Sequence, residues 1–164
     1  MSHFQVMPEC YADTLLVEML GFKGANHQLG IGKVIRNFGM LLKNRSAVGI
    51  IDNDKVKPKD LDTFQKTAER EGIIRLSKDK HHILVINPGF KDWVFQNAAA
   101  VDVNPEKYGF SNRKDFQRAC KRQDVKTDQN VKQLLNTLHQ KKAPGFVTLK
   151  TWICEATGIK EEDL

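Results

Sequence analysis

The chain has few cysteines and no long run of apolar residues. Its three cysteines, Cys10, Cys120 and Cys154, are too few and too scattered for a disulfide framework or a cysteine-rich zinc site. No segment approaches the roughly 20 apolar residues of a membrane span. The first residues also lack the charged region followed by an apolar region that marks a secretory signal. These absences predict free thiols, no membrane partner and a cytoplasmic location.

The chain also lacks the spacing of a phosphate loop, although the segment that leads to Gly32 is rich in glycine. Such a loop needs a glycine five residues before Gly32 and Ser or Thr after Lys33, where this chain has His27 and Val34. The missing spacing counts against a mononucleotide-binding α/β protein of flavodoxin-like order. We expect instead a turn into a helix over about residues 33–42, whose first amides and Lys33 can meet a phosphate.

Basic residues outnumber acidic residues by 26 to 20, which gives a formal net charge of +6. A positive balance raises the local concentration of anions and suits a polyanionic partner such as nucleic acid. A solvated, lysine-rich surface without such a partner is the alternative. The apolar fraction of 40% and the length of 164 residues are those of one ordinary globular domain.

The most informative stretch is a β-prone apolar run that ends at Asp52. It predicts a buried strand followed by the acidic pair Asp52 and Asp54. Side chains two residues apart in an extended chain point the same way, so both carboxylates can face one Mg²⁺ or Mn²⁺ ion. The alternative is a polar turn that leaves a strand.

A second acidic group follows the first predicted strand. Residues 3–7 alternate between polar and apolar side chains, and Glu9 ends that strand. Asp13 opens a predicted buried helix. If the two strands are parallel neighbours, Glu9 lies at the same edge of the sheet as Asp52 and Asp54.

Hydrophobic spacing and turn residues predict the other elements: a polar helix over 61–71, strands over 73–76 and 82–86, and helices over 90–101, 111–122, 130–140 and 147–157. The composition becomes more polar and basic after Asp102. We therefore divide the chain into a core, 1–101, and a basic helical extension, 102–164, that packs on it as one compact unit. Ser111 is the predicted N-cap of the 111–122 helix.

Basic side chains cluster in two places where we expect contact with nucleic acid. One is the loop after the acidic pair, and the other is the polar face of the 111–122 helix. The residues are Lys55, Lys57, Arg113, Lys114, Arg118, Lys121 and Arg122.

An acidic strand end, a helix, a glycine-containing turn, a second helix and a strand ending in Asp-x-Asp follow one another in this chain. That layout resembles the TOPRIM domain, particularly the small TOPRIM modules of overcoming-lysogenization-defect (OLD) nucleases. The matching residues are Glu9, Asp13, Asp52 and Asp54, and the resemblance covers about residues 3–90. Cys10 stands where many members of the family place glycine.

The resemblance implies a TOPRIM-like, Rossmann-like, mostly parallel sheet flanked by helices, with the helical C-terminal extension. It implies Mg²⁺-dependent hydrolysis of phosphodiester bonds in nucleic acid, with DNA favoured over RNA. Glu9, Asp13, Asp52 and Asp54 would be the metal ligands. Glu9 would also act as general acid or base, and Lys33 would lie near the scissile phosphate. A partner ATPase, which related nucleases often carry on the same chain, would act in trans.

Other activities of the family fit this chain less well. A topoisomerase needs a nucleophilic tyrosine with a DNA-binding module around it, and Tyr11 and Tyr108 have no such surroundings. A primase needs further template-handling domains. The remaining alternative to a nuclease is a non-catalytic TOPRIM-fold module that binds nucleic acid or acts with a partner protein.

Overall fold

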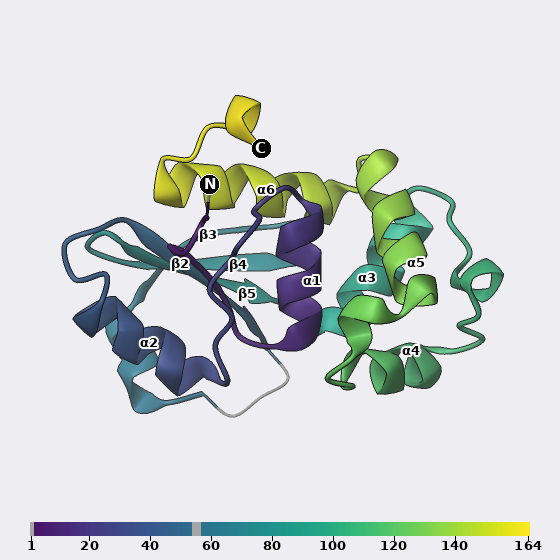
Figure 1. The fold of residues 1–164 in the computed structure, drawn as a ribbon, viewed down its shortest axis with the longest axis horizontal. Helices are drawn as coiled ribbons and strands as arrows, with labels where there is room; N and C mark the ends of the chain where they lie inside the picture. The colour runs from purple at the N-terminus through teal and green to yellow at the C-terminus, as the bar shows by residue number, and fades with distance from the viewer. Residues whose placement is uncertain (1, 54–56) are drawn as a thin grey trace.

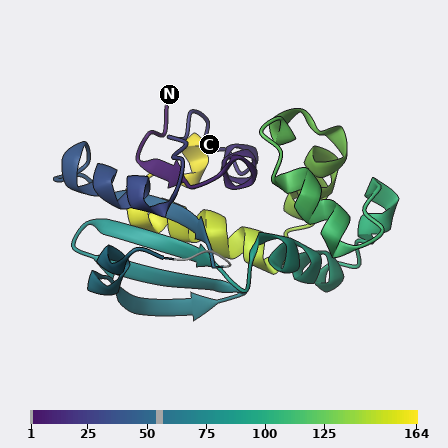
Figure 2. The ribbon, with the colours of Figure 1, turned by 90° about the horizontal axis from the view of Figure 1, so that it is seen from below.

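The computed structural model describes residues 2–53 and 57–164. Within these ranges the chain folds as an α/β protein whose five-stranded mixed sheet has helices against both faces (Figures 1 and 2). This arrangement confirms the α/β class predicted from the sequence. No helix in the described ranges is long and apolar enough to cross a membrane.

Parallel strands form one side of the sheet, and antiparallel strands form the other. The parallel strands are β1 (Val6–Pro8), β2 (Ala47–Asp52) and β5 (His81–Ile86). Strands β4 (Ile73–Lys78) and β3 (Gln65–Arg70) continue the sheet in antiparallel pairs. The order of the described strands is therefore β1-β2-β5-β4-β3.

The register of the parallel strands brings their carboxyl ends to one edge. Pro8 lies beside Ile50, and Asp52 lies beside Ile86. The first two strands are parallel neighbours, so the condition under which Glu9 shares an edge of the sheet with Asp52 is met. Every residue of β2 is buried, as expected for a parallel strand covered on both faces.

Helices α1 (Tyr11–Met19) and α6 (Pro144–Thr157) pack on the face of the sheet that carries Val48 and Ile50. Helix α2 (Ile31–Met40) packs on the opposite face. The buried positions of α2 are spaced i, i+3 and i+7, which places them on one side of a helix. The helices thus bury two separate clusters of apolar side chains, one on each face.

Gly49 in β2 allows α2 to lie close to the sheet. A Cβ atom at this position would lie 2.5 Å from Val34 Cγ1 and 3.5 Å from Phe38 Cζ. The first distance is too short for two carbon atoms, so any side chain at Gly49 would push α2 away.

Helices α3 (Phe90–Ala100), α4 (Arg113–Cys120) and α5 (Gln129–Gln140) form a group beside the sheet (Figure 1). Phe116 of α4 is fully buried, and its ring lies nearly parallel to that of Phe90, with centroids 6.0 Å apart. This stacking fastens α4 to the start of α3.

The helix predicted over 61–71 is wrong. These residues form a 3₁₀ turn, Lys59–Thr63, followed by strand β3. A polar sequence suits this edge strand because most of its side chains stay exposed, and pairing with β4 outweighs the local helix preference. Glu71 and Gly72, with φ values of 51° and 73°, close the β3–β4 hairpin in a turn of two left-handed residues.

The predicted cap of α4 is also wrong, by one residue. Asn112, not Ser111, precedes the first turn, and its side chain accepts a hydrogen bond from the Asp115 N–H at 2.9 Å. The other predicted helices are present, with ends that differ by a few residues. The largest shift is in α6, which begins at Pro144, and proline is common in a first helical turn.

Candidate functional site at the strand ends

The acidic residues at the ends of β1 and β2 lie side by side. The Glu9 backbone N–H donates a hydrogen bond to Ile50 O at 2.9 Å, which extends the pairing of the two strands. Glu9 Oε2 in turn accepts a hydrogen bond from the Asp52 backbone N–H at 3.3 Å. Only 3% of Glu9 and 7% of Asp52 is exposed. Parallel pairing therefore places two buried carboxyl groups at the carboxyl edge of the sheet.

Asp52 also stabilises the start of α3. Its Oδ1 and Oδ2 accept hydrogen bonds from the Phe90 backbone N–H at 3.1 and 3.2 Å. Phe90 is the first residue of α3, where backbone N–H groups have no partner within the helix. A carboxylate at this end is also favoured by the helix dipole.

Asp13 lies fully buried in the first turn of α1, whose N-cap is Cys10. The Cys10 thiol donates a hydrogen bond to Asp13 Oδ2 at 3.0 Å, and Cys10 Sγ accepts one from the Asp13 N–H at 3.5 Å. The thiol thus has the capping position that Ser or Asp usually occupies. This bond supplies a donor to a buried carboxyl group.

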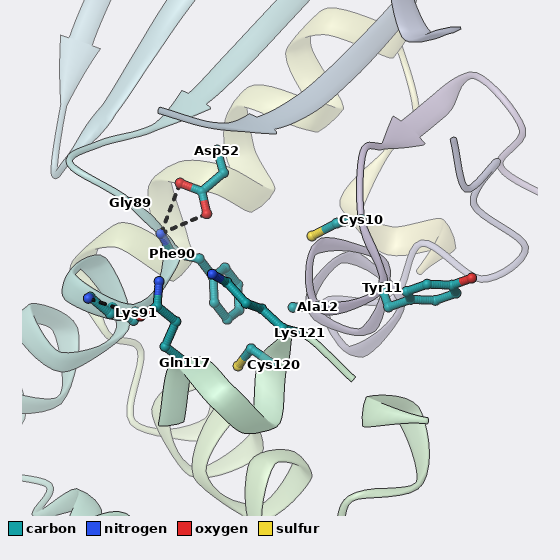
Figure 3. Close-up of a pocket in the computed structure, with 10 residues that line it drawn as sticks. All are labelled: Cys10, Tyr11, Ala12, Asp52, Gly89, Phe90, Lys91, Gln117, Cys120 and Lys121. Atoms are coloured by element: carbon teal, nitrogen blue, oxygen red, sulfur yellow. Dashed lines mark hydrogen bonds between the residues drawn. The ribbon is translucent and has the colours of Figure 1, made fainter. Parts of the chain in front are cut away.

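A pocket of about 320 Å³ opens beside these strand ends (Figure 3). We call it the strand-end pocket. One wall is the start of α1, and a second is Asp52 with the start of α3. The third wall is the carboxyl-terminal part of α4, with Gln117, Cys120 and Lys121.

Cationic and amide side chains lie at the α3 and α4 walls of the strand-end pocket. The Lys91 ammonium donates a hydrogen bond to Gln117 Oε1 at 3.2 Å, which links the two helices. Figure 3 shows the Lys121 side chain extending from the end of α4 toward the Asp52 side of the pocket. The lining of the pocket thus includes one carboxylate, from Asp52, and two lysine side chains.

The Cys120 thiol, on the α4 wall, is protonated at neutral pH. Burial raises its pKa above the usual range, and the negative charges of Asp13, Asp128 and Asp52 raise that pKa further. A thiol in this state is a poor nucleophile. Cys120 therefore contributes shape and apolar surface to the pocket. No disulfide joins the three cysteines, all of which lie in the described ranges, in agreement with the prediction from their number and spacing.

His27 lies in the segment between α1 and α2, and its imidazole ring makes two side-chain contacts. Its Nδ1 is 2.6 Å from Thr14 Oγ1, and its ring stacks on Tyr11 with centroids 4.6 Å apart. Burial lowers the pKa of His27, and the positive charge of Lys126 lowers it further. At neutral pH the imidazole is therefore uncharged.

Several residues predicted for the site lie elsewhere or outside the described ranges. Asp54 and Lys55 fall outside them. The Lys57 ammonium donates a hydrogen bond to Asn53 Oδ1 near the end of β2. Lys33 is exposed in the first turn of α2 and lines a different depression, on the α2 face. Among residues 2–53 and 57–164, no group of three or more His, Cys, Asp or Glu side chains is arranged to hold a metal ion.

The basic face predicted on the 111–122 helix is partly neutralised. Arg113 pairs with Asp92 at 2.6 Å, and Arg122 forms two hydrogen bonds with Asp124 at 2.9 and 3.0 Å. The exposed Arg118 lies 3.9 Å from the carboxylate of Asp115. Lys114 is exposed, and Lys121 lines the strand-end pocket.

The pocket residues that sequence reasoning did not assign to the site include Lys91, Gln117 and Cys120. Lys91 follows the predicted strand that became β5, so the rule that ligands bind at strand ends could have included it. Gln117 and Cys120 reach the pocket because Phe116, which precedes them on α4, packs against Phe90. No local pattern signals that packing.

Comparison of this chain with known protein families, curated proteins and solved structures finds no match. The functional argument therefore rests on the residues and geometry described above.

Proposed function

We propose that this protein hydrolyses phosphodiester bonds in nucleic acid, using a divalent cation held by Glu9 and Asp52. The observation that carries the proposal is the position of these two buried carboxyl groups at adjacent strand ends, where Glu9 Oε2 accepts a hydrogen bond from the Asp52 backbone N–H. Buried carboxyl groups repel one another when ionised, and a cation offsets that cost. The resemblance of Glu9, Asp13 and Asp52 to the TOPRIM pattern is part of the same proposal.

The donor set fits Mg²⁺ or Mn²⁺. Both ions prefer carboxylate and water oxygens, and Mg²⁺ is commonly held by one or two carboxylates together with substrate phosphate. Asp52 lines the strand-end pocket, so a cation at this carboxylate would be open to substrate. Asp13 is a less direct candidate because its Oδ2 accepts the Cys10 thiol hydrogen.

The chain's own residues would share the remaining tasks. The cation, when bound, stabilises charge on the phosphate and lowers the pKa of an attacking water. The Phe90 N–H fixes the orientation of the Asp52 carboxylate. Lys91 and Lys121, which line the same pocket, would bind the anionic phosphate. Glu9 accepts a proton from water at its carboxylate.

Labelled DNA and RNA, incubated with Mg²⁺ or Mn²⁺, test the proposal directly. We expect metal-dependent cutting by the wild type and a loss of at least 100-fold in Glu9→Gln and Asp52→Asn. Asp79→Asn is the matched control, because Asp79 lies in the β4–β5 turn and asparagine tolerates its φ of 54°. Metal-independent cutting, or equal cutting by all variants, would contradict the proposal.

A non-catalytic nucleic-acid-binding module is the second candidate. One observation favours it: Asp52 and Asp13 both accept hydrogen bonds from the protein itself, which gives the acidic residues a structural role. This candidate predicts that wild type binds nucleic acid without cutting it. It also predicts that Asp52→Asn binds as tightly as wild type, with or without metal.

A further inference from the structure

The strand-end pocket is small and closed on one side by α4. Its volume of about 320 Å³ is near the lower end of the range of about 300–1,000 Å³ for small-molecule sites. That space suits one nucleotide and is far too small for a base pair of an intact duplex. We therefore expect the part of a nucleic acid that enters the pocket to be a single unpaired residue.

The lining of the pocket matches the two ends of a nucleotide. Cys10, Ala12, Phe90 and Cys120 supply apolar surface, which suits the faces of a base. Lys91 and Lys121 supply positive charge, which suits a phosphate. In Figure 3 the amide nitrogen of Gln117 points toward Phe90, while the amide oxygen accepts the Lys91 hydrogen bond. Gln117 can therefore donate to a ligand from a fixed position.

Aromatic packing anchors the α4 wall. Phe116, its anchor, is fully buried, with Phe90 stacked 6.0 Å away and Phe110 edge-on at 5.1 Å. The Lys91–Gln117 hydrogen bond adds a second link between α3 and α4. A strand that entered between the strand ends and α4 would meet this wall, which Gln117, Cys120 and Lys121 form. The geometry therefore favours the end of a strand over an internal position.

We infer that the strand-end pocket binds the terminal nucleotide of a single strand, so that cutting begins at an end. This inference rests on the proposed hydrolytic function. In each cycle the oxygen of a water molecule forms a bond to phosphorus, and the bond between that phosphorus and one sugar oxygen breaks. The leaving oxygen takes up a proton. The products are one mononucleotide and a strand shorter by one residue.

Binding of mononucleotides tests the pocket without requiring turnover. We would titrate the protein with 2′-deoxyadenosine 5′-monophosphate, with the 3′-monophosphate and with inorganic phosphate, by calorimetry. At least one nucleotide should bind tenfold or more tightly than phosphate, because the base adds apolar contacts. Equal or weaker binding of both nucleotides would overturn the inference.

Gln117→Glu tests the position of the nucleotide. The substitution keeps the size of the side chain and its link to Lys91, but it puts a negative charge beside the bound phosphate. Nucleotide affinity should fall at least tenfold, whereas Gln133→Glu, on the exposed surface of α5, should leave it unchanged. Equal affinity in Gln117→Glu and wild type would overturn the assignment to this pocket.

A comparison of linear and covalently closed circular single-stranded DNA separates the two proposals. Cutting of the linear strand at a rate at least tenfold above that of the circle, with mononucleotides as products, supports terminal binding. Equal cutting of both forms would overturn terminal binding and leave the hydrolytic function standing. Absence of cutting in every form, with either metal, would overturn the hydrolytic function and the inference that rests on it.

Discussion

Three buried carboxyl groups, two at strand ends and one in the first turn of α1, accept hydrogen bonds from other groups of the protein. Glu9 accepts from the Asp52 N–H, Asp52 from the Phe90 N–H, and Asp13 from the Cys10 thiol. Each of these bonds favours one orientation of its carboxyl group before any ligand arrives. A substitution at these positions therefore affects stability as well as any ligand, and the two effects must be measured separately.

Asp52→Ala should lower the free energy of unfolding by about 1–2 kcal/mol, because the buried Phe90 N–H loses its acceptor. Asp52→Asn retains an acceptor oxygen and should lower it by about half as much or less. Urea denaturation of the three proteins measures both values. An alanine variant as stable as wild type would show that the carboxylate does not stabilise the start of α3.

Cys10 can be tested as a helix cap through two small substitutions. Cys10→Ser should keep or raise the free energy of unfolding, since serine caps well and its hydroxyl can donate to Asp13. Cys10→Ala should lower it by about 1 kcal/mol or more, because the cap is lost and Asp13 loses a donor. Thermal and urea unfolding measure the order, which should be serine, cysteine, alanine. Equal stability of the three would contradict the capping role.

At the scale of the secondary-structure elements, the close approach of α2 to β2 depends on one residue, Gly49. Gly49→Ala should lower the free energy of unfolding by about 1–3 kcal/mol, because the new Cβ would lie 2.5 Å from Val34 Cγ1. Gly39→Ala, in α2 with nothing within 4 Å of its Cβ position, should raise it by up to about 1 kcal/mol.

Val34→Ala completes a double-mutant cycle for that contact. It removes the methyl group that the new Cβ would meet, so Gly49→Ala should cost less in its presence. Urea denaturation of the single and double variants gives the coupling energy. Additive effects would show that Gly49 is not there to admit Val34.

Helix α4 offers two neighbouring basic residues with different surroundings. Lys121 lines the strand-end pocket, whereas Arg122 is engaged by two hydrogen bonds to Asp124. Lys121→Ala should reduce the slope of log affinity against log salt by about 0.7–0.9, the effect of one lost phosphate contact. Arg122→Ala should change the slope less. Titrations of a single-stranded oligonucleotide at several salt concentrations measure both, and the reverse order would contradict the assignment.

Elements with strong periodic patterns could be predicted from the sequence. Elements whose structure depends on pairing with another strand of the same sheet could not. Strand β2 ends at Asp52 as predicted, and helix α3 matches its predicted range closely. Burial on both faces of a strand, or on one side of a helix, leaves a clear apolar pattern. Strand β3 was missed because an edge strand with exposed polar side chains has no such pattern. Its identity as a strand comes from pairing with β4.

At the scale of the whole molecule, the strand-end pocket combines segments that are more than 100 residues apart. The carboxyl groups of Glu9 and Asp52 could be placed from the sequence, because the ends of parallel neighbours share an edge. The α4 wall, with Gln117 and Lys121, could not, because its position depends on aromatic packing between helices. The sequence therefore predicts the acidic part of the site and misses the wall that gives the pocket its size.

The stability of the whole molecule should fall as the pH drops below about 6.5. Burial lowers the pKa values of His27, His82 and His139 from their usual value of 6.5. The unfolded chain therefore binds protons more readily than the folded chain, and stability decreases as the pH falls through that value. Thermal unfolding at about pH 7.5 and about pH 5.5 measures the loss.

His27→Gln should reduce this pH dependence, because the variant removes one of the three histidines and keeps a polar partner for Thr14. A melting temperature that rises between about pH 7.5 and about pH 5.5 would contradict the sign of the effect.

Calorimetric titration with Mg²⁺ and Mn²⁺ tests the central claim most directly, because it asks whether the carboxyl groups of Glu9 and Asp52 hold a cation. The wild type should bind, Glu9→Gln and Asp52→Asn should each bind at least tenfold more weakly, and Asp79→Asn should bind like wild type. Urea denaturation in parallel ensures that each variant is folded. Wild-type protein that binds neither ion, with or without a single-stranded oligonucleotide, would contradict the claim.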